Sequence, residues 1–160
     1  MWKGRGDRIE AATFEEFFAT AERQVRYALV ALYGFEVGRE AAADALAYAW
    51  EHWPRIAGME NPAGYVYRVG QRLGRRMARR REVSLVVVAV EEHPTVEPGL
   101  ERALAQLSPG QRVAVVLVHA LGHTHREAAR LMRVSPSTVQ THLERALARL
   151  RTDLGVDVGR

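Results

Sequence analysis

Five helix-start signals divide this sequence, and they constrain its fold more than any other feature. Two are capping boxes, in which a Thr and a Glu three residues later satisfy the exposed amides of a helix start. Three are a cap residue followed directly by proline, which is favoured at the first helical position. The residues at these starts are Thr13, Asn61, Ser108, Thr124 and Ser135. Because apolar residues follow at three- and four-residue spacing, the sequence predicts an all-α fold.

The expected helices fall into two groups. Apolar spacing predicts helices over residues 13–34, 39–52 and 61–81 in the first group. Pro54 is expected to stop the second of these, because the residue before a proline disfavours helix. The second group comprises a short helix over 100–107, one from Ser108 to near Gly122, a short one from Thr124 to Met132 and a long one from Ser135. The tight turn at Arg133 before the last helix indicates a helix-turn-helix.

Residues 82–99 separate the two groups. They contain two prolines, a β-branched run and no helical period, so we predict a linker there. Residues 86–90 have the composition of a short strand but no partner strand, and we expect them to pack on a neighbouring helix face. The sequence therefore predicts two small helical domains, residues 1–81 and 100–160, joined by this linker. The second is a four-helix domain that contains the helix-turn-helix.

Charge is distributed in blocks along the chain. The 160 residues include 23 Lys and Arg against 19 Asp and Glu, a formal net charge of +4. Residues 61–81 carry seven arginines and no acid. Such a stretch gains little from salt bridges within its own helix. The block therefore favours a polyanionic partner.

The composition also excludes several classes of site. No cysteine is present, which removes disulfides, thiolate nucleophiles, iron–sulfur ligation and Cys-based zinc sites. The longest apolar run, Leu85–Val90, is far shorter than the roughly 20 residues of a membrane span. The first residues lack the apolar segment of a secretory signal. We therefore expect a cytoplasmic protein with no membrane insertion.

The segment from His125 to Leu147 has the pattern of a DNA-binding helix-turn-helix. Small Ala129 allows the two helices to approach closely, Leu131 and Val134 are expected to fill the space between them, and Val139 to anchor the second helix. The outward positions are short polar or cationic, as in recognition helices that reach base edges and phosphates in the major groove. These positions are Ser137, Thr138, Gln140, Thr141 and Arg145. The alternative is a small helical bundle with a solvated polar face.

The arginine block lies in a predicted helix that also carries aromatic residues. Cations neutralise phosphates and rings stack on unpaired bases, so this composition favours nucleic-acid binding. Tyr65 and Tyr67 point to different helix faces, so at most one meets a base while the other packs. A solvated run of charge is the alternative interpretation.

Together these motifs resemble a bacterial sigma factor of the extracytoplasmic-function type, from about Phe14 to Leu154. Residues 14–81 are similar to the domain that binds the clamp of core RNA polymerase and opens the −10 promoter element. Residues 104–154 are similar to the domain that reads the −35 element. The resemblance implies a sigma factor that directs core polymerase to specific promoters. It implies no bond-making chemistry, so the chain is not expected to be an enzyme or to need a cofactor or metal.

The resemblance also assigns residues to three kinds of contact. The −35 DNA contacts are expected at Arg126, Ser137, Thr138, Gln140, Thr141 and Arg145. The −10 contacts are expected at Asn61, Tyr65, Arg68, Arg72, Arg75, Arg76 and Arg79. The loop of residues 56–61 is the expected pocket for a base turned out of the stack. The core-polymerase contacts are expected at Glu40, Asp44 and Tyr48.

The implied partners follow from these contacts. They are double-stranded promoter DNA, its melted −10 strand and core RNA polymerase, and an anti-sigma protein is compatible with the same reading. The expected location is the cytoplasm, in association with the nucleoid. Joining two DNA sites by a linker raises their effective concentration, so neither domain needs high affinity alone.

The chain departs from the family pattern in two segments. In the clamp-binding segment, Ala43 stands where the family usually carries a Gln, and an alanine cannot make the hydrogen bonds of that side chain. In the −10 helix, Arg72 and Arg76 replace the common Asn and Asp. The added arginines raise the attraction to phosphate whatever the base sequence.

The sequence leaves other functions open. A helix-turn-helix regulator that binds DNA without polymerase would share this fold, and a scaffold that only binds an anti-sigma protein is not separated from a sigma factor. A metal-dependent enzyme would use His119 and His123, which stand four residues apart, with His125 and His142 nearby. Gly122 is expected to end the helix before His123, and no HExxH pattern is present, so the metal site is the weaker interpretation.

Overall fold

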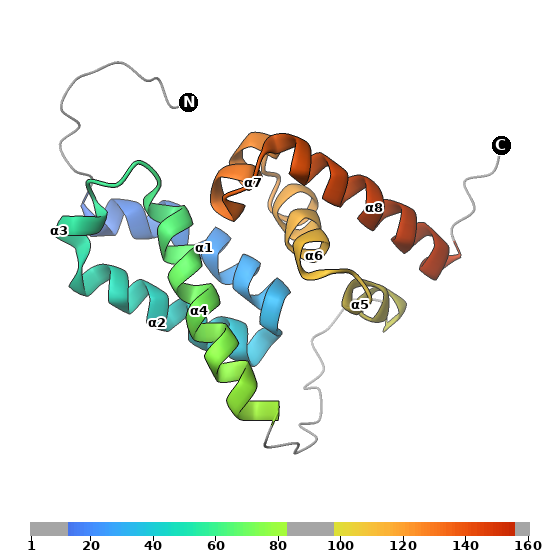
Figure 1. The fold of residues 1–160 in the computed structure, drawn as a ribbon, viewed down its shortest axis with the longest axis horizontal. Coiled ribbons are helices and arrows are strands. Elements are labelled where there is room, and N and C mark those ends of the chain that lie inside the picture. The colour runs from blue at the N-terminus through green and yellow to red at the C-terminus, as the bar shows by residue number, and fades with distance from the viewer. Residues whose placement is uncertain (1–12, 83–97, 156–160) are drawn as a thin grey trace.

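The computed structural model describes residues 13–82 and 98–155, and every regular element within them is a helix. The elements are α1 (Phe14–Tyr33), α2 (Phe35–Glu51), α3 (Trp53–Ile56), α4 (Pro62–Glu82), α5 (Pro98–Ala105), α6 (Pro109–Val115), the π-helix η1 (Val116–Ala120), α7 (His125–Met132) and α8 (Pro136–Leu154). Helices α1 to α4 form one group and α5 to α8 a second group beside it (Figure 1). The all-α prediction is confirmed.

All five predicted helix starts are present. Thr13 and Thr124 form reciprocal capping boxes with the Glu three residues later. Ser108 does the same with Gln111, a box that we did not predict. Asn61 accepts a hydrogen bond from the amide of Gly64 at 3.0 Å, and the Ser135 side chain accepts one from the amide of Thr138. These local signals fix where α1, α4, α6, α7 and α8 begin.

Three predicted boundaries are wrong. α2 begins at Phe35 rather than at residue 39, because Gly34, with φ +83°, ends α1 and immediately caps α2. Pro54 does not stop α2, which ends at Glu51; it lies in the first turn of α3, where a missing amide proton costs nothing. Pro98 was assigned to the linker and instead begins α5. The segment from 83 to 97, including the expected packing of residues 86–90, lies outside the described residues.

α1, α2 and α4 pack closely around small residues. A Cβ on Gly38 of α2 would overlap the backbone of Val30, and a Cβ on Gly70 of α4 would overlap the side chain of Leu29. The two glycines therefore allow α2 and α4 to approach α1 closely. Tyr33 donates a hydrogen bond from its hydroxyl to the carbonyl of Gln71 at 2.8 Å, which ties the end of α1 to α4. Tyr67 is buried and packs inward, and burial raises the pKa of its phenol. Tyr65 is only half-buried, so the two tyrosines point to different faces of the helix, as predicted.

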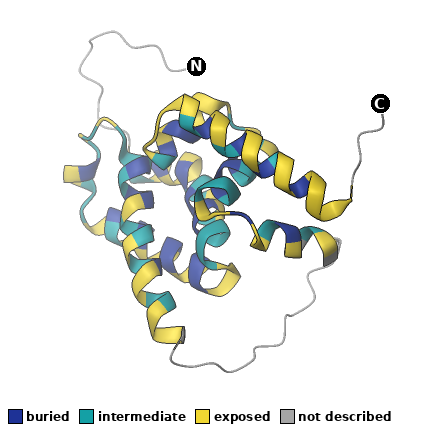
Figure 2. Cartoon of the chain, turned by 45° about the vertical axis from the view of Figure 1, so that its right-hand side comes forward, coloured by how far each residue is buried: buried dark blue, intermediate teal, exposed yellow. Residues whose placement is uncertain are grey.

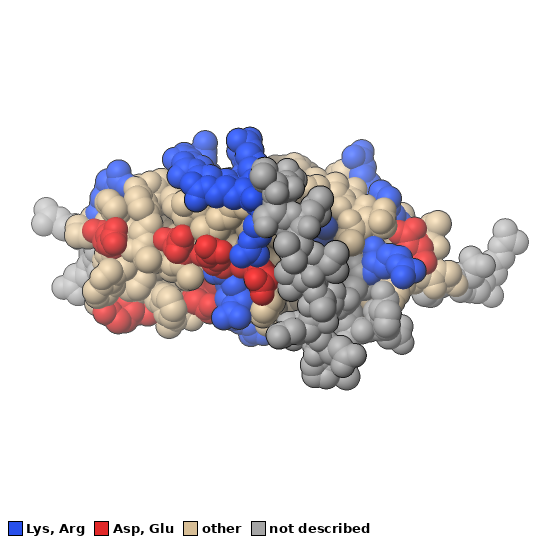
Figure 3. Space-filling view, turned by 90° about the horizontal axis from the view of Figure 1, so that it is seen from below, with Lys and Arg blue, Asp and Glu red and all other residues tan. Residues whose placement is uncertain are grey.

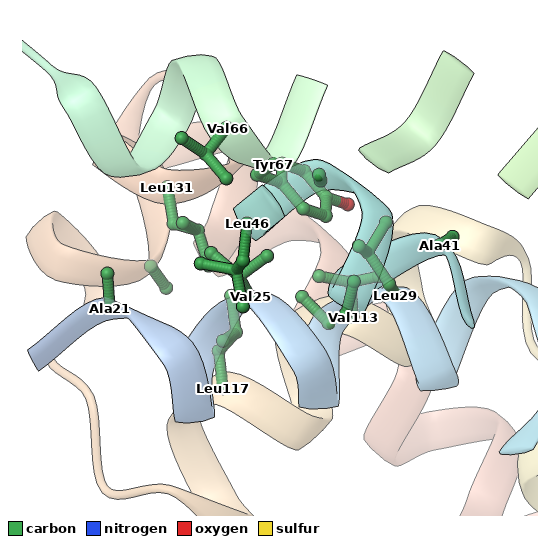
Figure 4. Close-up of a cluster of buried hydrophobic side chains, with 14 of the residues drawn as sticks. Ala21, Val25, Leu29, Ala41, Leu46, Val66, Tyr67, Val113, Leu117 and Leu131 are labelled. Carbon is green, nitrogen blue, oxygen red and sulfur yellow. The ribbon is translucent and has the colours of Figure 1, made fainter. Parts of the chain in front are cut away.

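One apolar core runs through both groups of helices. Val25 and Leu29 of α1 lie in the same cluster as Val113 of α6 and Leu117 of η1, and all four are almost fully buried (Figure 4). Dark buried segments continue from one group into the other in Figure 2. A smaller cluster of Ala103, Leu107, Ala146 and Leu150 lies within the second group alone.

The helix that faces α1 widens into a π-helix. The amide of Leu121 donates to the carbonyl of Val116 at 3.0 Å, a five-residue step, and the amide of His123 donates to the carbonyl of Leu117 at 2.9 Å. π-helices are rare and occur mostly as single turns. Here η1 is in contact with α1, and it presents Leu117 to the shared core. The sequence pattern did not predict this widening.

The turn of the helix-turn-helix depends on a left-handed residue. Arg133 has φ 58° and ψ 43°, and its amide donates to the carbonyl of Ala129. The amide of Val134 also donates to Ala129, at 3.1 Å, so the last turn of α7 is closed tightly. Glycine adopts this conformation without a Cβ clash, whereas arginine does so at a cost.

Leu117→Ala should destabilise the entire body rather than the second half alone. Removing this buried side chain should lower the free energy of unfolding by about 2–5 kcal/mol. All three tryptophans lie within residues 1–53, so their fluorescence reports on the first half. We expect the tryptophan-detected midpoint to fall in a denaturant titration. Leu150→Ala, in the separate small cluster, is the matched control and should move that midpoint less. A tryptophan-detected midpoint that Leu117→Ala leaves unchanged would contradict a core shared between the halves.

Arg133→Gly should stabilise the fold. Relief of the left-handed strain should raise the free energy of unfolding by about 1 kcal/mol, as measured by thermal unfolding followed by circular dichroism. Arg149→Gly removes the same side chain from the exposed interior of α8 and should lower the free energy by about 1 kcal/mol. If both variants lose stability, the strain at Arg133 is offset by contacts of its side chain.

Candidate nucleic-acid interface

The outer face of α8 is polar and open to solvent. Five of the six residues predicted to contact −35 DNA are exposed, and Thr138 is half-buried. The exposed residues are Arg126, Ser137, Gln140, Thr141 and Arg145. The opposite face buries Val139 and Leu143, which anchor α8 against the rest of the domain. The structure therefore brings the predicted residues together on the two helices of the helix-turn-helix.

Hydrogen bonds on this face hold its side chains in defined places. The hydroxyl of Ser135 lies 2.9 Å from that of Ser137 and 2.8 Å from that of Thr138. Gln140 donates from Nε2 to Oε1 of Glu144 at 2.9 Å. Glu144 is exposed beside the predicted contacts, and sequence reasoning passed over it. A carboxylate there can accept from a cytosine amino group and repels nearby phosphates.

The arginines predicted to contact −10 DNA form a stripe along α4. All five are exposed, and they share one side of the helix with the half-buried Tyr65. They are Arg68, Arg72, Arg75, Arg76 and Arg79. Arg81 is different, because it makes ion pairs with Glu36 at 3.5 Å and Glu40 at 3.4 Å on α2. Figure 3 shows a group of basic side chains at the upper centre of this face with acidic side chains beside it, and further basic side chains elsewhere on the surface.

A groove of about 700 Å³ separates this stripe from α2. Tyr48 and Tyr65 face each other across it, and the guanidinium of Arg55 bridges them, with Nη2 at 2.7 Å from the Tyr48 hydroxyl and 3.3 Å from that of Tyr65. The hydrogen bond from Tyr65 and the cations Arg55 and Arg72 lower the pKa of Tyr48. That hydrogen bond raises the pKa of Tyr65. Tyr48, predicted to contact polymerase, therefore also lines the groove beside the −10 stripe.

Sequence reasoning missed Arg55 because it lies in the short helix α3, where we expected a break. Its partners come from α2 and α4, seven and ten residues away, so no local spacing signals the cluster. The other predicted polymerase contacts, Glu40 and Asp44, are exposed one turn apart on α2. Asp44 and Glu51 line the acidic wall of the groove opposite the arginines.

A second groove, of about 720 Å³, lies between α1 and α2 and is largely apolar. Phe18, Phe35 and Trp50 line it, and they are 42%, 46% and 58% exposed. These large apolar side chains are open to solvent although each belongs to a helix with a buried apolar face. Phe14 packs edge-on against Trp50 with ring centroids 5.1 Å apart, which steadies that ring at the surface. Exposed aromatic patches of this kind mark interaction sites.

Asn61 is placed differently from the other predicted −10 contacts. Its Oδ1 accepts from Gly64 as the helix cap, and its Nδ2 donates to the carbonyl of Arg130 in α7 at 2.8 Å. The loop of residues 56–61 begins at the fully buried Ile56 and ends at this contact. The loop therefore lies between α3, α4 and the helix-turn-helix.

The described residues contain no group of three or more His, Cys, Asp or Glu side chains that could hold a metal ion. His123 lies 3.1 Å from Gln24, a contact between the two halves of the chain. None of the helices in residues 13–82 and 98–155 is both long and apolar enough to cross a membrane.

The chain was compared with known proteins by sequence and by structure. Residues 99–150 match the family "Sigma-70, region 4". The fold is similar to that of the sigma factor RpoE from Bartonella quintana, solved in complex with the anti-sigma factor NepR, with a TM-score of 0.67 at 21% identity over 90% of this chain and 98% of that one. No curated protein matches this chain in sequence. These findings confirm the resemblance to a sigma factor of the extracytoplasmic-function type. Residues 99–150 thus match sigma-70 region 4, and the chain that carries them has a fold similar to that of the sigma factor RpoE.

Proposed function

We propose that this protein is a sigma factor that directs core RNA polymerase to promoters by binding two DNA elements. The observation that carries the proposal is that a region 4 helix-turn-helix with an open polar face occurs in the same chain as an arginine stripe beside a tyrosine pair. The first feature suits duplex DNA and the second suits a melted strand. The protein makes and breaks no bonds in this role, so it is not an enzyme.

The helix-turn-helix would bind the −35 element. α8 would enter the major groove with Ser137, Gln140 and Thr141 toward the base edges, while Arg126 and Arg145 contact phosphate or a guanine edge. The buried face of α8 and the hydroxyl network at Ser135 limit side-chain freedom before binding. Less conformational entropy is then lost when DNA binds.

The −10 element would bind along α4. Its arginines would neutralise successive phosphates of the melted strand. Tyr65 would stack on an unpaired base, supported by Arg55 and Tyr48. The loop of residues 56–61 would receive a base turned out of the duplex. The replacement of the family's Asn and Asp by Arg72 and Arg76 shifts this surface from base reading toward phosphate binding.

Core polymerase would dock on α1 and α2. The apolar groove with Phe18, Phe35 and Trp50 supplies contact area. The exposed acids Glu40 and Asp44 lie on α2, one of the two helices that form the groove. Apolar contacts of this kind would offset the binding energy that is lost because Ala43 cannot make the hydrogen bonds of the family's Gln. An anti-sigma protein is a further proposed partner, since the similar sigma factor RpoE was solved with one. The proposed location is the cytoplasm, where polymerase and the nucleoid lie.

Run-off transcription tests the proposal. The purified chain is added to core polymerase with fragmented genomic DNA, and transcript start sites are mapped. Discrete starts that require the chain are expected for a sigma factor. DNA binding without any effect on start sites would instead indicate a free-standing helix-turn-helix regulator.

Trp50→Ala should weaken binding to core polymerase. The ring is 58% exposed, so its removal should barely change folding stability, yet an aromatic anchor at an interface contributes about 1–3 kcal/mol. Affinity is measured by fluorescence anisotropy of the labelled chain titrated with core polymerase. Tyr27→Ala, which removes another exposed aromatic ring outside the groove, should leave the affinity unchanged. Equal losses would show that the groove is not the docking surface.

Arg72→Ala and Arg76→Ala should each weaken single-strand binding by a similar factor for all sequences. Each lost phosphate contact should reduce the slope of log affinity against log salt by about 0.7. The slope is measured by titrating single-stranded DNA at several salt concentrations. Arg23→Ala removes an equal charge from an exposed position on α1 and should leave the slope unchanged. A loss confined to particular sequences would mean that these arginines read bases.

A further inference from the structure

Glu144 is an acid on the side of α8 that is proposed to meet DNA. Gln140 and Glu144 follow Ser137 by three and seven residues, so the three side chains form one stripe along the helix. All three are exposed, and Figure 2 shows the outer side of this helix open to solvent. The carboxylate of Glu144 has the same sign of charge as the phosphates of DNA. It therefore opposes DNA binding in general.

Ion pairing within the fold does not account for this acid. Asp153 in the same helix pairs with Arg149, with Oδ2 and Nε 3.8 Å apart. Glu144 makes no ion pair within residues 13–82 and 98–155. The positions three and four residues away on either side, where a helical ion pair would form, carry no cation. They are Gln140, Thr141, Leu147 and Ala148.

The carboxylate of Glu144 instead holds the amide of Gln140. Nε2 of Gln140 donates to Oε1 of Glu144 at 2.9 Å, across one turn of the helix. Because an ionised carboxylate only accepts hydrogen bonds, the nitrogen of the Gln140 amide must face it. The amide oxygen and the second N–H proton of Gln140 are thereby left for another partner. Glu144 thus sets which way the Gln140 amide is turned.

The neighbouring hydroxyls are short and already bonded within the chain. The Thr141 hydroxyl donates to the carbonyl of Ser137 at 3.0 Å, and the Ser137 hydroxyl lies 2.9 Å from that of Ser135. Gln140 and Glu144 have longer side chains. A carboxylate has about four sites that accept hydrogen bonds, so Glu144 keeps free capacity after its bond to Gln140. The amide–carboxylate pair is therefore better suited than these hydroxyls to reach a base edge.

A carboxylate in the major groove distinguishes the bases by their amino groups. Cytosine presents its N4 amino group there, whereas guanine presents the two acceptors N7 and O6. Thymine presents an acceptor and a methyl group, and adenine has an acceptor beside its amino group. Glu144 should therefore accept from cytosine and repel guanine. The free side of the Gln140 amide, with one acceptor and one donor, matches the N6 amino group and N7 of adenine.

We propose that Glu144 is a specificity-determining residue, which selects cytosine at one position of the duplex and turns the Gln140 amide toward adenine at a neighbouring position. This inference rests on the proposed function, because it takes α8 as the helix that enters the major groove. The charge of Glu144 weakens binding to every duplex, and a site with cytosine at this position recovers the lost affinity. Glu144 thus raises the ratio of specific to non-specific binding through a repulsive element.

Selection of duplexes from a randomised pool tests this assignment. The full chain is bound to the pool, alone and with core polymerase, and base preferences are read from the enriched duplexes. We expect wild type to prefer cytosine at one position and Glu144→Ala to lose that preference by roughly 10-fold. Glu144→Ala should also bind duplexes of unrelated sequence more tightly, because a charge that repels phosphate is gone. A purely structural side chain would instead weaken both kinds of binding together.

Three further variants separate base reading from charge and from positioning. Asp153→Ala removes an acid near the other end of the same helix and should leave every base preference unchanged. Glu144→Gln removes the charge, keeps an acceptor and adds a donor, so guanine should become tolerated at the cytosine position. Gln140→Ala should abolish the preference for adenine at the neighbouring position, which Glu144→Ala should only reduce. Thermal unfolding shows whether each variant still folds.

Each outcome decides the inference. Loss of the cytosine preference in Glu144→Ala, with tighter non-specific binding, supports it. Glu144→Ala that selects the same bases as wild type overturns it, even if wild type supports run-off transcription. A wild-type pool without any preference for cytosine, alone and with polymerase, also overturns it. Selective duplex binding that depends on Glu144, without promoter-specific transcripts from wild type, contradicts the proposed function alone.

Discussion

The structure depends on the burial of α1 on two sides. α2 and α4 cover one side of this helix, while α6 and η1 cover another. Val25 and Leu29 therefore contribute to a core that neither half could complete alone. Roughly 25 cal/mol per Å² of buried apolar surface is gained at such contacts, so separating the halves exposes apolar surface to water. A body held in this way is stable when free and costs energy to open.

α4 combines two demands that oppose each other. Its buried face, with Val66, Tyr67 and the close approach at Gly70, must pack tightly against α1 and α2. Its outer face carries a run of arginines that repel one another, because the block contains no acid within residues 61–81. Arg81, at the end of the block, forms ion pairs with Glu36 and Glu40 on α2. The apolar packing must therefore offset the repulsion, and a polyanion that binds the stripe relieves it.

Local signals predicted the fold, and long-range contacts account for what they missed. A helix cap bonds an amide three residues along the chain, so the local signals at Thr13, Thr124 and Ser135 marked their helices correctly. The tight turn at Arg133 also follows from local spacing. Helical periodicity shows which face is apolar, but it does not show which apolar residues find a partner, and Phe18 and Trp50 remain largely exposed. The contacts of Arg55 join the neighbouring helices α2 and α4, and those of Arg130 join elements far apart in the chain, so no single-helix pattern contains them.

Packing of the halves against each other competes with use of both DNA sites. Two sites on a linker gain avidity only when both engage at once, and effective concentration then replaces high affinity at either site. The closed core holds the two proposed sites within a body roughly 40 Å wide, which limits how far apart on DNA they can engage at once. A partner that binds only the open state shifts the population by its difference in affinity between the two states. A partner that docks on α1 and α2 therefore opens the chain only if docking also disturbs the side of α1 that packs on Leu117. The apolar groove lies on α1 and α2, the same helices that contribute Val25, Leu29 and Leu46 to the shared core.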